Sequence, residues 1–209
     1  MHNEITKAEV LDTLRAERSR WEDLLAAVGD PRMTQQVPGG LWSPKDIMAH
    51  VAWYEQEAAV VLQAGNDPHA RRDWLWAIPE YQRNAILNRE HRERPLGEVR
   101  ATAQEAYAHL VAAVVALTEE NGRDPQRFPH MPPGWTPWQF IAVHSYEHYR
   151  EHTPALRAWL DTTAPDADQT PRRLVTAGAP AARQAVAPAL SGSALETNIT
   201  RWEEEGGRV

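Results

Sequence analysis

The chain has 209 residues, of which 42% are hydrophobic, so it can bury one sizeable core, whereas two full domains would each be small. Its formal net charge is −7 without a long run of Lys and Arg, which argues against nucleic-acid binding because phosphate neutralisation needs a concentrated basic face. It contains no cysteine, so disulfides, thiolate metal sites and cysteine nucleophiles are excluded and any metal ligands must be nitrogen or oxygen atoms.

No apolar run approaches the roughly 20 residues of a membrane span. The first ten residues, MHNEITKAEV, lack the basic start and apolar stretch of an export signal. We therefore expect a cytoplasmic protein that acts on a small-molecule substrate and has neither a membrane nor a nucleic acid as its partner. A homodimer is one hypothesis for its assembly state.

Three segments carry the pattern of a helix N-terminus, in which a capping hydroxyl is followed three residues later by an acid or an amide. They are Thr6 to Glu9, Ser43 to Asp46 and Thr136 to Gln139. Pro44 and Pro137 directly follow two of these caps, at a position where a missing N–H costs nothing. These patterns predict helices that begin at residues 7, 44 and 137.

Apolar residues spaced by three, four and seven extend these starts and add one further helix. In chain order, the predicted helices cover residues 7–28, 44–64, 95–117 and 137–160. The connection 66–94 is long for a loop, and Pro79-Glu80-Tyr81 indicates a short helix within it, which we expect to lie across one end of the molecule. Because no stretch alternates with period two, the sequence predicts an all-α, antiparallel four-helix bundle with this long connection.

The predicted bundle forms one domain, residues 1–161. After Asp161 the composition shifts to Ala, Pro, Thr and Arg, which predicts an irregular Ala/Pro-rich tail over residues 162–209. A capping box from Ser193 to Glu196 indicates a short helix near 194–205 within this tail, on which Leu195, Ile199 and Trp202 would share one face.

Histidines are stacked on the predicted 137–160 helix, where His144, His148 and His152 recur every four residues. The apolar seam of this helix leads onto His148 and His152. Burying imidazoles there without partners would cost on the order of a few kcal/mol each. His50 flanks the seam of the 44–64 helix and can supply a third nitrogen, so these residues predict a metal site. The alternative is that each is an ordinary hydrogen-bonded histidine.

Three segments carry a resemblance to a known family. They are W-S-P-K-D-I-M-A-H at 42–50, the stretch 78–117, and E-H-Y-R-E-H-T-P-A-L at 147–156. In order and spacing they resemble the DinB/YfiT-like superfamily of four-helix bundles, and within it the ClbS/DfsB family, over residues 5–161. The resemblance implies that His50, His148 and His152 hold a divalent ion, zinc or nickel. It also implies hydrolysis or thiol transfer on a small electrophile, in stress or self-resistance.

A competing ligand register uses His144 in place of His152. If the 44–64 and 137–160 helices began level, His50 would lie about 10 Å below its cap, His144 about 12 Å and His152 about 24 Å. The seam and the resemblance favour His152, which leaves His144 as the alternative ligand or as a residue that orients a ligand. Pro154 is expected to kink the helix just past His152.

Tyr54 lies one turn beyond His50 and is a candidate catalytic residue, with a core tyrosine whose hydroxyl is satisfied as the alternative. Trp42, Trp53 and the Trp74-Leu75-Trp76 segment could wall an apolar pocket. Three functions follow from these residues: a metal-dependent enzyme, a non-catalytic protein that sequesters a small molecule, or a bundle whose metal only stabilises the fold.

Overall fold

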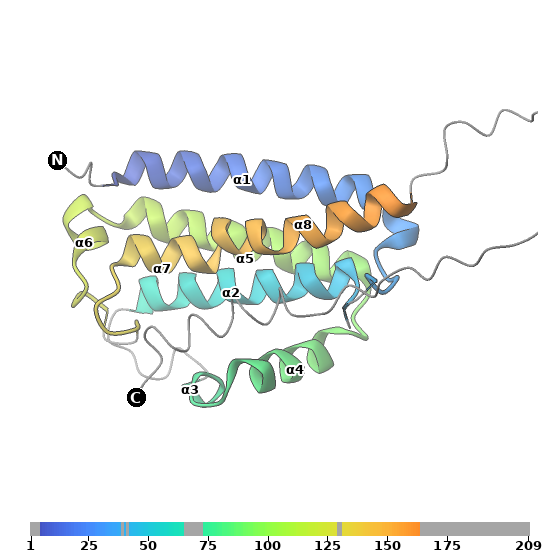
Figure 1. The fold of residues 1–209 in the computed structure, drawn as a ribbon. Helices are drawn as coiled ribbons and strands as arrows, with labels where there is room; N and C mark the ends of the chain where they lie inside the picture. The colour runs from blue at the N-terminus through green and yellow to red at the C-terminus, as the bar shows by residue number, and fades with distance from the viewer. Residues whose placement is uncertain (1–4, 39, 41, 65–72, 129–130, 164–209) are drawn as a thin grey trace, which may run out of the picture. The chain divides into compact units, whose positions relative to one another are not determined.

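The structure is a computed structural model that describes residues 5–38, 40, 42–64, 73–128 and 131–163 (Figure 1). Every regular element within these ranges is a helix, which confirms the predicted all-α class. The elements are α1 (Lys7–Val28), η1 (Asp30–Arg32), α2 (Pro44–Ala64), α3 (Asp73–Trp76), α4 (Glu80–His91), α5 (Leu96–Ala116), α6 (Glu119–Arg123), α7 (Pro137–His144) and α8 (Tyr146–Thr163). The predicted helix near 194–205 lies outside the described residues, and the division at residue 161 stays a prediction.

The three predicted helix starts are held by reciprocal hydrogen bonds between the cap and the third helical residue. At the start of α1, the Thr6 amide donates to Glu9 at 2.8 Å and the Glu9 amide donates to the Thr6 hydroxyl at 3.2 Å. Ser43 and Asp46 make the same exchange before α2, and the Thr136 to Gln139 segment does so before α7. Each pair satisfies amide groups that a helix end leaves without partners.

The long helices α1, α2 and α5 lie side by side with the α7–α8 pair (Figure 1). Lys45, at the start of α2, donates to the carbonyls of Arg92 and Arg94 just before α5, so α2 and α5 begin at the same end. Lys7, at the start of α1, donates to the carbonyl of Leu117 just past α5, so α1 runs in the opposite direction. The α7–α8 pair runs in the same direction as α1 (Figure 1).

The expected position of the short helix across one end of the molecule is wrong. The segment containing α3 and α4 runs along the side of α2: Trp76 donates to Glu57 at 3.1 Å, and Arg83 donates to the Tyr54 hydroxyl. An apolar cluster fixes it there, comprising Trp53, Tyr54, Leu75 and Leu87. Burial of these side chains against α2, which a helix lying across an end would forgo, explains the position.

The predicted 137–160 helix is interrupted at Ser145, which has φ −140° and ψ −94°. The Ser145 hydroxyl donates to the Ile141 carbonyl at 2.5 Å, and its amide donates to the Ala142 carbonyl. The interruption therefore lies before His148, whereas the sequence predicted a kink after His152. Beyond Ser145, α8 continues without a break through Pro154 to Thr163.

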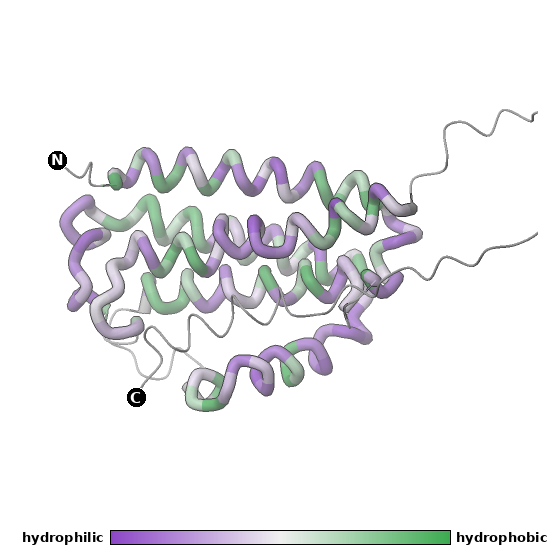
Figure 2. The backbone as a smooth tube through the Cα atoms, in the orientation of Figure 1, coloured by the Kyte–Doolittle hydropathy of each residue, from purple (hydrophilic) through white to green (hydrophobic). Residues whose placement is uncertain are grey.

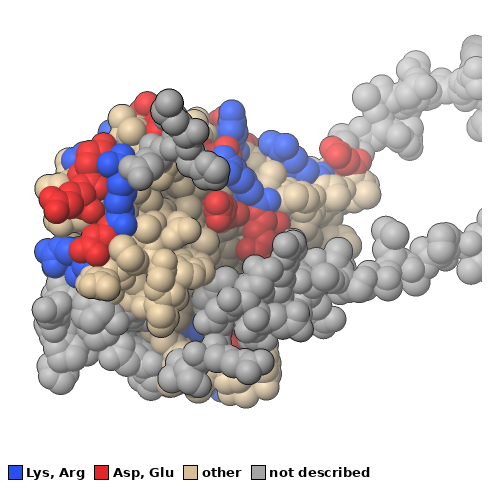
Figure 3. All heavy atoms as spheres, turned by 60° about the vertical axis from the view of Figure 1, so that its left-hand side comes forward, with Lys and Arg blue, Asp and Glu red and all other residues tan. Residues whose placement is uncertain are grey.

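The core lies between α1, α2, α5 and α7–α8. Figure 2 shows hydrophobic residues recurring along α2, α5 and α7, while α4 is largely hydrophilic. The largest fully buried side chains include Trp21, Trp138, Tyr149, Phe140, Leu14, Leu110 and Ile141. None of the described helices is both long and apolar enough to cross a membrane. On the face drawn in Figure 3, acidic and basic side chains are interspersed around a broad uncharged area.

A buried polar network joins α1, α2, α5 and α8. Arg18 lies 3.2 Å from a carboxylate oxygen of Glu55, donates to the Tyr149 hydroxyl at 3.4 Å and donates to the Ala103 carbonyl at 3.3 Å. Tyr149 in turn donates to Glu55. Burial raises the pKa of Glu55 to about 7, although the charge of Arg18 acts in the opposite direction. This network ties the four helices together at one level of the core.

We expect Glu55→Ala to lower the free energy of unfolding by about 3–5 kcal/mol, because Arg18 would lose its buried carboxylate and keep only the exposed Glu22, 2.7 Å from its Nε, as a charged partner. Glu55→Gln should cost clearly less, since it keeps the shape and an acceptor for both neighbours. Urea unfolding of the two variants checks this difference. Equal losses, or a loss below about 1 kcal/mol for Glu55→Ala, would show that the network contributes little.

Candidate metal centre

The three histidines predicted as ligands lie together between α2 and α8. One ligand atom from each of His50, His148 and His152 can be chosen so that all three lie within 4.8 Å of one another. The closest pair is Nε2 of His50 and Nε2 of His148, at 2.9 Å. His50 and His148 are buried, with 5% and 8% of their surface exposed, and His152 is partly buried.

The opposite directions of α2 and α7–α8 explain which histidines meet. His50 lies near the start of α2, so it faces α8 rather than the start of α7. Tyr54 lies one turn further along α2, and its ring centroid is 5.6 Å from that of His144. His144 was predicted as the alternative ligand on the premise that the two helices begin level. The contacts contradict that premise, because the helices start at opposite ends.

Burial favours the neutral form of all three imidazoles. Desolvation lowers the pKa of His50 and His148 well below the usual value, and the positive charge that a neighbouring histidine would carry lowers it further. Burial lowers the pKa of His152 to about 4. Neutral imidazole is the form that binds metal ions, so near neutral pH the cluster is in the ligand state.

A divalent ion fits this donor set. Nδ1 of His50, Nδ1 of His148 and Nε2 of His152 are buried and have no hydrogen-bond partner within the described part of the chain. Imidazole nitrogens that share one zinc ion at 2.0–2.1 Å are separated by roughly 3 Å, close to the 2.9 Å between His50 and His148. An ion bound by the facing Nε2 atoms of His50 and His148 would leave Nδ1 of both rings outside its reach, so among the costly unpartnered nitrogens it is Nε2 of His152 that would gain the ion as a partner.

His144 is buried next to this cluster but is not one of the three histidines whose nitrogens converge. Its Nδ1 lies 2.9 Å from the Phe140 carbonyl, one turn back on α7, and since a carbonyl can only accept, Nδ1–H is the donor. Its ring approaches Trp76 at 5.7 Å. His144 therefore belongs to the wall beside the cluster.

Tyr54 contacts the cluster with its ring rather than with its hydroxyl. The ring meets His50 and His148 edge-on, with centroids 4.9 and 4.8 Å apart. The hydroxyl accepts from Arg83 at 3.1 and 3.2 Å and donates to Asn84 at 3.2 Å, both on α4. Burial also raises the pKa of Tyr54. In this position the hydroxyl is satisfied by α4.

Aromatic side chains surround the cluster, as the tryptophan content suggested. Trp42 lies edge-on to His50 with ring centroids 4.7 Å apart, and Trp53 stacks on Trp76 at 5.5 Å. Leu75 is fully buried, and the side chain of Trp74 lies outside the described part of the structure. Trp42 thus contacts His50 directly, whereas Trp53 and Trp76 reach the cluster through the Tyr54 ring.

Sequence reasoning missed Arg83, which is only 3% exposed. Its guanidinium lies 4.5 Å from the centre of the Trp76 ring and also holds Tyr54. The four-residue spacing from Arg83 to buried Leu87 was the available signal, but a charged residue in a long connection is ordinarily exposed. Arg83 gives this side of the cluster a buried positive charge.

The chain belongs to the DinB superfamily, whose family model matches residues 13–156, more than half of its length. This superfamily includes metal-binding members, and the histidine triad described above could hold a metal ion. No match was found among curated proteins.

Solved structures share this fold at low sequence identity. The chain is similar to DfsB, described as a sibling lethal factor precursor, with 15% identity, a TM-score of 0.64 and coverage of 78% of this chain and 99% of that one. A Streptococcus pneumoniae protein is 12% identical, with a TM-score of 0.62 and coverage of 78% and 94%. An uncharacterised Escherichia coli UTI89 protein is 16% identical, with a TM-score of 0.59 and coverage of 75% and 94%. At these identities the likeness shows the fold alone.

Acid should destabilise the metal-free protein through these histidines. A histidine in the unfolded chain takes up a proton near pH 6.5, whereas His152 in the folded chain does so only near pH 4. The contribution of His152 to the free energy of unfolding is therefore fully present above pH 6.5 and is lost as the pH falls towards 4. The free energy of unfolding should fall by about 3 kcal/mol through His152 over this range. Urea unfolding with a chelator present, at several pH values, measures it. His152→Gln should flatten the pH dependence and exposed His109→Gln should not; indistinguishable curves would contradict this assignment.

Proposed function

We propose that the chain is a metal-dependent enzyme in which His50, His148 and His152 bind one divalent ion, zinc or nickel. The observation that carries the proposal is the convergence of three neutral, largely buried imidazoles, in which Nε2 of His50 lies 2.9 Å from Nε2 of His148 and Nε2 of His152 has no partner among the described residues. A purely structural core would place apolar side chains at these positions, because unpartnered imidazoles are costly there.

An ion held by only three protein nitrogens supplies a Lewis acid with open coordination positions. The residues around it shape what can reach those positions. Trp42, beside His50, and Trp76, beside Tyr54, would give an apolar substrate aromatic contacts, while Arg83 would attract an electron-rich group near Tyr54. We keep Tyr54 as a proposed participant through its ring contacts with the ligands.

The proposed reaction is hydrolysis or thiol transfer on a small electrophilic molecule, with a role in stress or self-resistance. What supports this is the resemblance of residues 42–50 and 147–156 to the ClbS/DfsB family. We read α1, α2, α5 and the α7–α8 pair as the antiparallel four-helix bundle of that family. We further propose that the protein acts in the cytoplasm on a small molecule rather than on nucleic acid or a membrane, and a homodimer stays a hypothesis.

Turnover of model electrophiles by the metal-loaded full chain tests the proposal. We expect zinc- or nickel-dependent cleavage of p-nitrophenyl acetate, or transfer of a small thiol to 1-chloro-2,4-dinitrobenzene, and loss of that activity in His148→Ala. His109→Ala removes an exposed histidine on α5 and is the matched control. Metal-bound protein without turnover on either substrate would favour the structural or sequestering alternatives, and turnover that survives in His148→Ala would refute the proposed site.

Metal content should distinguish the ligands from their neighbours. We expect about one divalent ion per chain in the wild type and none in His148→Ala, as measured by elemental analysis after dialysis. His152→Ala should lower the affinity far more than His144→Ala, whose loss should stay within the ~10 to 100-fold typical of residues that orient a ligand. The reverse order of losses would place the ion beside Phe140, one turn towards the start of α7.

A further inference from the structure

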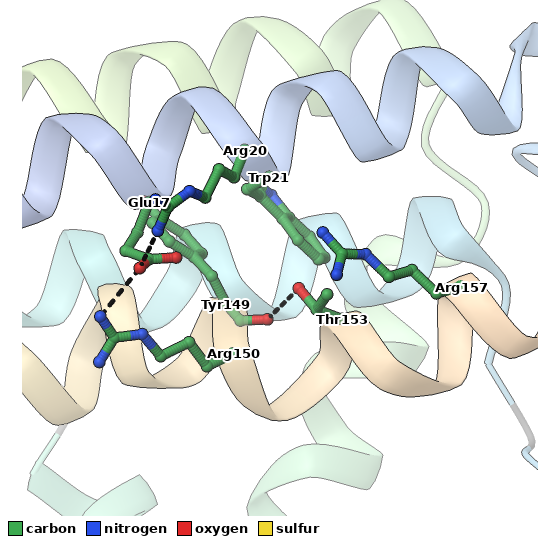
Figure 4. Close-up of a pocket in the computed structure, with 7 residues that line it drawn as sticks. All are labelled: Glu17, Arg20, Trp21, Tyr149, Arg150, Thr153 and Arg157. Carbon is green, nitrogen blue, oxygen red and sulfur yellow. Dashed lines mark hydrogen bonds and ion pairs between the residues drawn. The ribbon is translucent and has the colours of Figure 1, made fainter.

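A groove of about 320 Å³ lies between α1 and α8 (Figure 4). Side chains from both helices point into it, among them Glu17, Arg20, Trp21, Tyr149, Arg150 and Arg157. On α8 its lining residues recur at 149, 153 and 157, one step round the helix from His148 and His152. The groove therefore occupies a different flank of α8 from the histidine cluster, and the proposed function makes no use of it.

The charge of this groove is opposite to that of the chain. Three guanidinium groups face one carboxylate, whereas the chain as a whole has a net charge of −7. Arg20 and Arg150 both donate to Glu17, at 2.6 and 2.8 Å. Arg157 is exposed and makes no ion pair with any residue that the structure describes. The groove thus keeps an excess of positive charge after its internal pairs are counted.

Aromatic rings line the groove beside these cations. Trp21 and Tyr149 stack with centroids 5.7 Å apart and planes 10° from parallel, and both are almost fully buried. Figure 4 shows the Trp21 ring between Arg20 and Arg157. The Thr153 hydroxyl donates to the Tyr149 carbonyl, so it is already engaged. The groove combines a rigid aromatic floor with guanidinium groups at its rim.

We propose that this groove binds a small planar organic anion, an aromatic phosphate or carboxylate, whose acid group pairs with Arg157 and Arg20 above Trp21. Guanidinium forks match the oxygens of such groups. A volume of about 320 Å³ is at the lower end for ligand pockets, which limits the ligand to about the size of one substituted ring. Glu17 holds Arg20 and Arg150 in place without neutralising all three cations.

Ligand-detected NMR titration of the full chain with phenyl phosphate at low ionic strength tests this site, because exposed charges are screened by salt. We expect a dissociation constant on the order of 1 mM for so small a ligand. Arg157→Gln should weaken binding at least about tenfold, through loss of a charge-assisted hydrogen bond. Arg15→Gln removes the same charge from the exposed surface of α1 outside the groove, so it is the matched control and should change binding less than about twofold.

Two further ligands and one variant decide the remaining points. Inorganic phosphate should bind more weakly than phenyl phosphate, and benzyl alcohol should not bind detectably. His148→Ala should bind phenyl phosphate like the wild type, so the result does not depend on the proposed metal site. Absence of binding, equal weakening by Arg157→Gln and Arg15→Gln, or equal affinity for the two phosphates would overturn the proposal. Loss of binding in His148→Ala would place the anion at the histidine cluster instead.

Discussion

The contact between α2 and α8 buries imidazoles where a helical protein ordinarily buries aliphatic side chains. Removal from water keeps His50 and His148 neutral, and neutrality makes them ligands rather than cations that repel one another. The same burial leaves Nε2 of His152 without a partner among the described residues, and a shared ion would supply one. The proposed chemistry thus depends on how closely these two helices pack.

The register between α2 and α8 is held by residues that are neighbours in sequence of those in and beside the histidine cluster. Glu55 follows Tyr54 on α2, and Tyr149 follows His148 on α8, so each neighbour points about 100° away, towards Arg18 on α1. The buried network and the histidine cluster therefore occupy adjacent flanks of the same helix pair. A shift of α8 along α2 that separated the histidines would also separate Tyr149 from Glu55.

Structural features that depend only on residues close together in the sequence were predictable. Each helix start depends on a cap and a residue three positions later, as Thr6 and Glu9 show, so the pattern is complete within one turn of chain. The three histidines that come together were likewise identified, but from the apolar seam and the family resemblance together, since helix spacing alone favoured His144 over His152.

Features that depend on tertiary packing were not predictable from the same patterns. Helix periodicity does not determine whether α7–α8 runs parallel or antiparallel to α2. The observed antiparallel direction contradicts the premise on which His144 was the alternative ligand. The position of α4 along α2 depends on Leu75 and Leu87 finding Trp53 and Tyr54, and the interruption at Ser145 has no proline or glycine to mark it. Arg18 and Arg83 were overlooked because arginine is ordinarily exposed, and the partners that permit their burial here, Glu55 and Tyr54, lie far away in the sequence.

X-ray absorption spectroscopy of the zinc- or nickel-loaded protein can test whether three histidines bind the ion, because it counts the ligand atoms around the metal. We expect three imidazole nitrogens and at least one exchangeable ligand that is not from the protein. His152→Ala should reduce the imidazole count to two, while His144→Ala should leave it at three. A site saturated by four or more protein ligands, or an unchanged spectrum in His152→Ala, would contradict the proposed centre.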